Sequence, residues 1–276
     1  MLPSPGLAIE GVLVVTGFAV ISYASRIVDR GGLLAGLLVG YLVYVFGGRF
    51  LFLPLLTFHL SAGVFTKYKY EEKRRKGVAE EKMGARGWRN VLANGGIAAL
   101  FASAAGIGGS SENSIFLAGF LGAIGTAAAD TAATEVGLLY KNPPRLITDL
   151  NTRVPAGTPG GVSVLGEAAQ ILTSVLVTVA VVVFMPFAAF AAWAFGITTV
   201  ASFAGSTVDS LIGATVQTLF RCEICGRTTE RRVHCGQRAV HIRGKPWLDN
   251  NIVNIVATGF GALVAVALQV SGALSF

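Results

Sequence analysis

Long apolar runs recur along the whole chain, with short polar or basic segments between them. Most of these runs are longer than a β-barrel strand, and their polar positions do not alternate with a period of two, so each is predicted to be a transmembrane α-helix. The second run is short and the seventh is long enough to break near Gly205, so seven or eight spans are expected. The pattern predicts an all-α transmembrane bundle with spans at residues 7–25, 33–47, 50–66, 90–106, 114–138, 161–185, 187–218 and 252–274.

Composition agrees with a protein that spans a membrane several times. Hydrophobic residues make up 53% of the chain and charged residues 13%, which is far from the average of soluble domains. Because no large polar segment interrupts the apolar runs, residues 1–276 are expected to form a single membrane domain. Residues 67–89 are predicted to be a basic cytoplasmic loop or a solvated amphipathic helix, and residues 219–248 a cytoplasmic cysteine–histidine loop. The first run has no preceding basic region and no small-residue cleavage site, so it is expected to be a retained helix rather than a signal peptide.

The basic residues predict the orientation of the spans. With the N-terminus outside, 21 of the 22 lysines and arginines fall in cytoplasmic loops, and only Arg49 lies outside. Because basic loops stay on the cytoplasmic side, we expect a multi-pass protein of the cell membrane with its active site on the cytoplasmic face. The net charge of +7 reflects this topology and would attract anionic lipid, nucleotide or phosphorylated substrate. Nothing in it requires nucleic acid as a partner.

Three carboxylates with small, apolar flanks stand near the cytoplasmic ends of predicted helices. They are Asp130, Glu167 and Asp209. Ionisable groups inside a membrane segment are costly, and those that are kept usually have a function. Glu135 is a further candidate, but it lies about 140° around an ideal helix from Asp130. Both carboxylates serve one ion only if the helix unwinds; otherwise Glu135 serves a different site or holds a neighbouring helix or Arg145.

Amide, guanidinium and carboxylate side chains begin the fourth and the last predicted helices on the same side of the membrane: Arg86, Arg89, Asn90, Asn94, Asp249, Asn250 and Asn254. Arg86, Asn90 and Asn94 are four residues apart and therefore share one helix face. Because arginine binds phosphate through two parallel hydrogen bonds, this face suits a phosphate or the polar edge of a nucleotide. Taken singly, Arg86, Asp249 and Asn250 equally fit ordinary residues of a membrane interface.

Two further segments bear on the same site. A glycine-rich turn at residues 157–163 precedes a helix start, where backbone amides favour an anion. Its candidate phosphate-binding residues, with two nearby arginines, are Gly157, Thr158, Gly160, Gly161, Ser163, Arg145 and Arg153. Residues 125–137 and 205–215 also resemble each other, each with a glycine, a small-residue turn and an aspartate. Related halves lining one site and the common use of small residues in packed membrane helices both explain this likeness.

All three cysteines lie in residues 221–236, as Cys222-x-x-Cys225 and His234-Cys235. This spacing is typical of a structural zinc site, with His234 or His241 as the fourth ligand. Thiols stay reduced in the cytoplasm, which disfavours a disulfide. A basic hairpin with incidental cysteines is the alternative, and any zinc is expected to brace the loop rather than to catalyse a reaction.

Several motifs resemble the phytyl-phosphate kinase family of membrane proteins, which includes plant enzymes of the vitamin E pathway and prokaryotic homologues. The resemblance covers roughly residues 85–255. The motifs that carry it are Arg89-Asn90-Val-Leu-Ala-Asn94-Gly95, Asp130-Thr131-x-x-x-Glu135-x-Gly137, Pro144-Arg145-Leu-Ile-Thr148, Gly157-Thr158-x-Gly160-Gly161-Val-Ser163 and Asp209-Ser210-x-x-Gly213-Ala214.

The resemblance implies a kinase that converts an isoprenyl monophosphate to the diphosphate with a nucleoside triphosphate, CTP being one candidate. Joining two phosphates calls for Mg²⁺ and cationic side chains that offset their repulsion. Asp130 and Asp209 are then the expected Mg²⁺ ligands, with Glu135, Glu167 and Asp249 as secondary candidates.

Two other classes of function use the same residues. A CTP-dependent lipid cytidylyltransferase would release pyrophosphate instead of a nucleoside diphosphate. An ion-coupled transporter would place the carboxylates near the middle of the membrane, whereas the sequence predicts them at one edge. A purely structural membrane scaffold would not need so many buried carboxylates.

Overall fold

The computed structural model describes residues 4–108 and 114–274. Its long helices are α1 (Pro5–Ala24), α2 (Arg30–Lys67), α4 (Trp88–Ile107), α5 (Ser114–Gly137), α6 (Val164–Val182), α7 (Ala188–Thr215) and α8 (Asn250–Val270), and a short helix α3 (Tyr70–Lys76) follows α2. The seven long helices are all apolar enough to cross a membrane. The expected all-α transmembrane bundle is therefore confirmed.

The helix α2 crosses the bundle twice, because its chain reverses at Gly48. This glycine has a φ of 62°, in the left-handed region that glycine adopts without strain. Tyr44 and Phe52 lie on either side of the reversal, and their ring centroids are 5.1 Å apart, whereas eight residues of straight helix would separate them by roughly 12 Å. The two arms of α2 correspond to the separate spans expected at residues 33–47 and 50–66, so seven helices give eight crossings.

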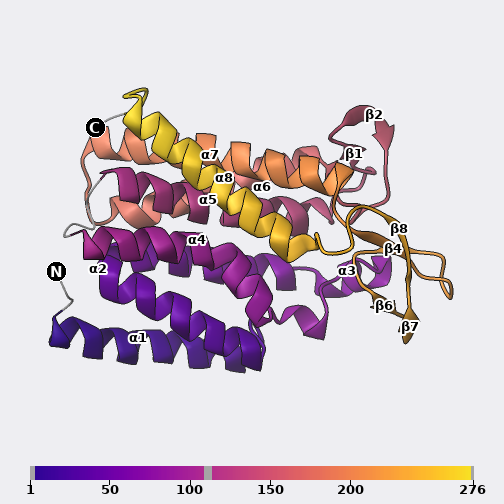
Figure 1. Ribbon diagram of the computed structural model, residues 1–276, viewed down its shortest axis with the longest axis horizontal. Helices are drawn as coiled ribbons and strands as arrows, with labels where there is room; N and C mark the ends of the chain where they lie inside the picture. Colours follow the sequence, from indigo (N-terminus) through magenta and orange to yellow (C-terminus); the bar gives the residue numbers. More distant parts are fainter. Residues whose placement is uncertain (1–3, 109–113, 275–276) are drawn as a thin grey trace.

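Eight crossings bring both termini to one end of the bundle and all strands to the other (Figure 1). The strands β1 (Arg145–Leu146), β2 (Asp149–Arg153) and β3 (Gly161–Val162) form one small antiparallel sheet, in the order β2-β1-β3. The strands β4 (Leu219–Arg221), β5 (Thr228–Thr229) and β8 (Val240–Arg243) form a second sheet, and β6 (Val233–His234) pairs with β7 (Gln237–Arg238). We call this the strand-bearing end. The basic loops lie here, while Arg49 lies at the opposite end and pairs with Glu10.

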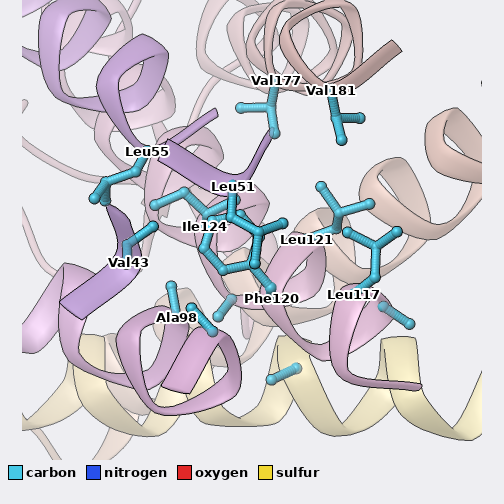
Figure 2. Close-up of a cluster of buried hydrophobic side chains, with 14 of the residues drawn as sticks. Val43, Leu51, Leu55, Ala98, Leu117, Phe120, Leu121, Ile124, Val177 and Val181 are labelled. Atoms are coloured by element: carbon cyan, nitrogen blue, oxygen red, sulfur yellow. The ribbon is translucent and has the colours of Figure 1, made fainter. Parts of the chain in front are cut away.

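The core is built around α5, which contacts every other long helix except α1 extensively. Leu117, Phe120, Leu121 and Ile124 of α5 are fully buried and face residues of α2, α4 and α6 (Figure 2). Small residues let α7 and α8 approach the other side of α5. The Thr126 hydroxyl donates to the Gly122 carbonyl at 2.8 Å and lies where α7 and α8 expose backbone at Gly205 and Gly261. This close three-helix crossing fixes the axial positions of α5, α7 and α8.

Substituting Gly261 with alanine tests this crossing. The new methyl group would overlap the Thr126 hydroxyl and lie 2.9 Å from the Gly122 carbonyl oxygen. Overpacking of this kind costs about 1–3 kcal/mol, so thermal unfolding in detergent should begin at a lower temperature. Gly259→Ala is the matched control on the same helix, because a methyl group there meets nothing within 4 Å. Equal stability of the two variants would contradict the close crossing.

Candidate active site

Asp130 and Asp209 come together at the strand-bearing end of α5 and α7, which run in the same direction (Figure 1). Gly125 and Gly205 let the two helices touch: a side chain on Gly125 would meet α7 at 2.5 Å, and one on Gly205 would overlap α5. In each helix the aspartate follows the glycine by little more than one turn. The carboxylates of Asp130 and Asp209 repel each other electrostatically. The likeness between residues 125–137 and 205–215 thus coincides with a reciprocal contact of the two segments.

Two asparagines tie Asp209 to α4 and α8. In the amide orientation that satisfies both polar atoms of Asn254, its nitrogen donates to the Asp209 carboxylate at 3.2 Å and its oxygen accepts from the Asn94 amide at 3.1 Å. Asn94 also donates to the Asn90 carbonyl at 3.0 Å. Asn94 and Asn254 are both buried. A buried, connected hydrogen-bond network of this kind fixes the direction of the carboxylate.

An apolar groove among α1, α2 and α4 ends beside this network. Its cavity volume is about 110 Å³. Its walls are mostly aliphatic and aromatic, and polar side chains gather toward the strand-bearing end: Ser22, His59, Thr66, Arg86, Asn90, Asn94 and Thr131. Thr131 directly follows Asp130 in α5, and Asn94 belongs to the network of Asp209. The groove therefore combines mostly apolar walls with a polar end that is linked to the carboxylate pair through Asn94.

Arg86 is held at this polar end by three groups. Its guanidinium donates to Glu80 at 2.7 Å, to Glu135 at 2.8 Å and to the Thr66 hydroxyl at 3.1 Å. It also acts electrostatically on Asp130. Its side chain is 19% exposed. An anionic group in the groove would therefore meet a fixed and partly desolvated guanidinium.

Glu135 is committed to ion pairs on the other side of α5. Its side chain is 3% exposed and accepts from Lys73 at 2.7 Å as well as from Arg86. Lys73 of α3 is completely buried, which differs from a solvated helix at residues 67–82. Of the two alternatives left open for Glu135, the structure shows it holding neighbouring elements, through Lys73 and Arg86 rather than through Arg145.

Like Glu80, Glu230 is a carboxylate near this site that the sequence did not indicate. It follows β5 in the cysteine–histidine loop, is half-buried and acts electrostatically on Asp209. Burial raises the pKa of Glu230 to about 7, and the nearby carboxylates of Glu80 and Asp130 add to the rise. No local signal marks it, because it lies in an exposed basic stretch 21 residues beyond Asp209.

The remaining predicted residues of α4, α6 and α8 lie at the strand-bearing end, and Glu167 makes no contact with the aspartate pair among the described interactions. At the rim, Arg89 pairs with Asp249 at 2.7 Å, and Asp249 caps α8 by accepting from the Asn251 amide. Asn250 begins α8, and its carbonyl accepts from Asn254. Glu167, in the first turn of α6, accepts from Gln170 at 2.8 Å.

The glycine turn at residues 157–163 packs closely against α7. Gly160 has a φ of 79°, and a side chain there would lie 2.6 Å from the Ser210 carbonyl oxygen. The Thr158 hydroxyl donates to the Pro155 carbonyl, and the Ser163 hydroxyl caps α6. Packing on α7 thus gives a reason for glycine at position 160, and the use of the turn as a phosphate cradle stays a prediction. The other candidates of this segment, which border the turn on exposed or half-buried strands and loops, are Arg145, Arg153, Gly157 and Gly161.

The four predicted ligands of the cysteine–histidine loop lie together. The ligand atoms of Cys222, Cys225, His234 and Cys235 are all within 4.8 Å of one another. His241, the alternative fourth ligand, instead packs its ring against Phe220, with the centroids 5.5 Å apart. Among the described residues, geometry therefore favours His234.

Comparison with known proteins agrees with the motifs. The sequence profile of the family described as "Integral membrane protein DUF92" matches residues 13–262. The chain is 28% identical to "Protein VTE6, chloroplastic" of Arabidopsis thaliana over 248 residues, 87% of this chain and 65% of that protein. It is 31% identical to "Protein PGR" of Arabidopsis thaliana over 268 residues, 90% of this chain and 91% of that protein.

The chain is also 31% identical to membrane protein MJ0933 of Methanocaldococcus jannaschii over 166 residues, 60% of this chain and 66% of that protein. The chain thus spans slightly less than two thirds of the length of VTE6 and of MJ0933. No solved structure gives a significant match. These matches confirm the family that the sequence motifs indicated.

Proposed function

Because the chain belongs to the DUF92 family of integral membrane proteins, we propose that it is a membrane kinase that phosphorylates an isoprenyl monophosphate to the diphosphate. The proposal takes its reaction from the resemblance to phytyl-phosphate kinases. The observation that carries it is the apolar groove whose polar end is lined by Arg86 and Asn94, with Asn94 linked through Asn254 to Asp209. A lipid phosphate has the same two parts, an apolar chain and an anionic head.

The residues at the end of the groove fit the needs of the acceptor phosphate. Arg86 lies just before α4, so it does not share a helix face with Asn90 and Asn94 as the sequence predicted. It offers a fixed guanidinium, and Asn90 of α4 also lines the groove. Charge-assisted hydrogen bonds to phosphate are short and strong. Arg86 is already oriented by Glu80 and Glu135, so little side-chain entropy is lost when the phosphate binds.

The Asp130–Asp209 pair fits a hard divalent cation, since two carboxylates that repel each other gain from a shared positive ion. When bound, Mg²⁺ would offset the charge of the two reacting phosphates. Asp130 and Asp209 would hold the cation, and the hydrogen bond from Asn254 fixes the orientation of the Asp209 carboxylate. Arg89, half exposed at the rim, is placed to meet the phosphates of an incoming nucleoside triphosphate.

In the proposed reaction, an oxygen of the lipid phosphate attacks the terminal phosphorus of the nucleotide. The bond from that phosphorus to its bridging oxygen breaks, and the nucleoside diphosphate leaves with the electron pair. Both phosphates are ionised near neutral pH, so positioning and charge stabilisation suffice. Asp130 and Asp209 lie in the last two turns of their helices, which suits a site reached from one side and argues against transport.

Product analysis tests the proposal. The purified protein in detergent is incubated with Mg²⁺, a labelled nucleoside triphosphate, either CTP or ATP, and a set of isoprenyl phosphates. We expect an isoprenyl diphosphate and a nucleoside diphosphate. Release of pyrophosphate with a nucleotide-linked lipid would identify a cytidylyltransferase instead, and turnover of none of these lipids would refute the proposal.

A narrower groove should discriminate against long acceptors. Gly36 lines the groove, and a Cβ atom added there meets nothing within 4 Å, so the side chain of Gly36→Leu would begin in open space and narrow the groove. Excluding two methylene groups of the lipid would cost about 1.6 kcal/mol, which is more than tenfold in kcat/KM. We expect this loss for long-chain acceptors and a smaller loss for short ones. Gly17→Leu, on α1 and with equally open surroundings, is the control.

A further inference from the structure

The cysteine–histidine cluster has the dimensions of a tetrahedral zinc site. Around one zinc ion, two sulfur ligands lie about 3.8 Å apart, and sulfur and nitrogen ligands slightly closer. The Nδ1 atom of His234 lies 3.6 Å from the Cys225 sulfur and 3.3 Å from the Cys235 sulfur. The Cys222 sulfur lies 3.8 Å from the His234 carbonyl oxygen, on the same side of the loop.

The backbone is shaped so that adjacent residues reach one point. Neighbouring side chains on a strand point to opposite faces, so His234 and Cys235 could not share a metal in an extended chain. Cys235 instead has a φ of 51° and Gly236 a φ of 78°, the pattern of a tight hairpin turn between β6 and β7. A cysteine in this left-handed conformation is strained, because its Cβ atom crowds the backbone. Such strain persists where the surroundings enforce it, as a metal ion does.

Beyond β4, whose Leu219 and Phe220 are buried, the described part of the loop has little apolar core. Its strands are two to four residues long. Its large apolar side chains Ile224, Val233, Val240 and Ile242 are each about half exposed. Small units with so little burial usually depend on a metal or on disulfides, and soft thiolate ligands select zinc among the common divalent ions.

The same loop contacts residues next to the candidate active site. Arg231 pairs with Glu81 at 2.5 Å, next to the Glu80 that holds Arg86. The Arg227 guanidinium occupies the space that a side chain on residue 77 would take, which only glycine leaves free. Between these two arginines, β5 pairs with β4, and β4 follows the end of α7 that carries Asp209. β5 leads directly into Glu230, which acts electrostatically on Asp209 and lies between the two halves of the metal cluster in sequence.

From this arrangement we infer that Cys222, Cys225, His234 and Cys235 bind one zinc ion, and that the zinc-bound loop holds Glu230 at the Asp130–Asp209 pair as a third carboxylate. Zinc then has a structural role with a consequence at the active site: without it, the loop loses its shape and Glu230 its position. The second part rests on the proposed function, because it concerns the same carboxylates, whereas the first part is independent of it.

Metal analysis of the whole protein tests the first part. Protein purified in detergent under reducing conditions and supplied with Zn²⁺ should carry one zinc per chain. Cys225→Ser and His234→Ala should lose it, while His234→Cys, which supplies a fourth thiolate, should keep it. His241→Ala should also keep it, because His241 packs on Phe220 outside the cluster. Two results would overturn the inference. One is a wild-type protein that binds no zinc, and the other is a His241→Ala variant that loses zinc as completely as His234→Ala does.

Binding of Mn²⁺, a spectroscopic substitute for Mg²⁺, tests the second part without any phosphate transfer. Loss of a residue that supports a metal site typically weakens binding 10- to 100-fold. We expect a weakening of about this size in Glu230→Gln, with zinc content unchanged, and a similar one after removal of zinc from the wild type. In Glu230→Gln, removal of zinc should weaken Mn²⁺ binding little further. Glu223 is an exposed carboxylate of the same loop, and Glu223→Gln should bind Mn²⁺ as the wild type does.

The outcomes separate the inference from the proposed function. If Mn²⁺ binds tightly and its affinity changes neither on zinc removal nor in Glu230→Gln, the proposed role of the loop is wrong, while the kinase proposal is unaffected. Absence of Mn²⁺ binding in the zinc-loaded wild type would overturn the carboxylate site itself, and with it the second part of the inference. The zinc content would still decide the first part.

Discussion

Replacing Asp130 with asparagine is expected to lower Mg²⁺-dependent phosphate transfer at least about a hundredfold, since loss of one preorganised electrostatic group commonly costs 10²–10³ in kcat. Asparagine has nearly the same shape, so the contact between α5 and α7 at Gly125 and Gly205 should be unaffected. Asp209→Asn should have an effect of similar size. The variants are compared in the labelled-nucleotide assay at several Mg²⁺ concentrations.

The Mg²⁺ dependence distinguishes a metal ligand from a merely structural aspartate. A ligand variant should need much more Mg²⁺ for its residual activity, whereas a structural variant should lose stability at unchanged Mg²⁺ dependence. Asp149→Asn is the matched control, because Asp149 is an exposed aspartate of β2 at the same end. Full activity of Asp130→Asn at low Mg²⁺ would remove Asp130 from the metal site.

The sequence predicts the spans well because apolar runs of membrane length have few alternatives to helices. It also indicates which carboxylates meet, since Asp130 and Asp209 follow similar small-residue segments that turn out to touch. The division of α2 is visible in the sequence only as two short apolar runs around Gly47 and Gly48. The reversal itself follows from the positive φ of Gly48.

Other residues depend on tertiary partners that no local pattern reveals. Lys73 stands among charged neighbours and looks solvated, and only its partner Glu135, 62 residues away, explains its burial. Glu230 reaches the aspartate pair because a small sheet folds its loop back on the bundle. Gly160 fits a phosphate cradle by sequence, while the structure shows a close contact with α7. In each case the sequence indicates the chemical character of the residue but does not predict which residue it contacts in the folded protein.

Breaking the buried pair of Glu135 and Lys73 should destabilise the protein severely. Glu135→Gln leaves the completely buried Lys73 ammonium without its counter-ion, although two carbonyls, Phe65 and Thr66, still accept from it. Removing one partner of a buried ion pair costs about 3–5 kcal/mol. We therefore expect a large drop in the unfolding temperature in detergent, and a much smaller one for Glu71→Gln, whose carboxylate is 72% exposed and pairs only at the surface.

The double variant Lys73→Met, Glu135→Gln separates the structural role of Glu135 from a catalytic one. Methionine removes the buried ammonium and retains most of the volume, so part of the lost stability should return, because apolar replacements of buried pairs are often tolerated. Arg86 keeps Glu80 as its partner and should stay at the end of the groove. If Glu135 acts only by holding α3 and Arg86, the double variant should regain transfer activity together with stability. A stable double variant without activity would instead place Glu135 in the reaction itself.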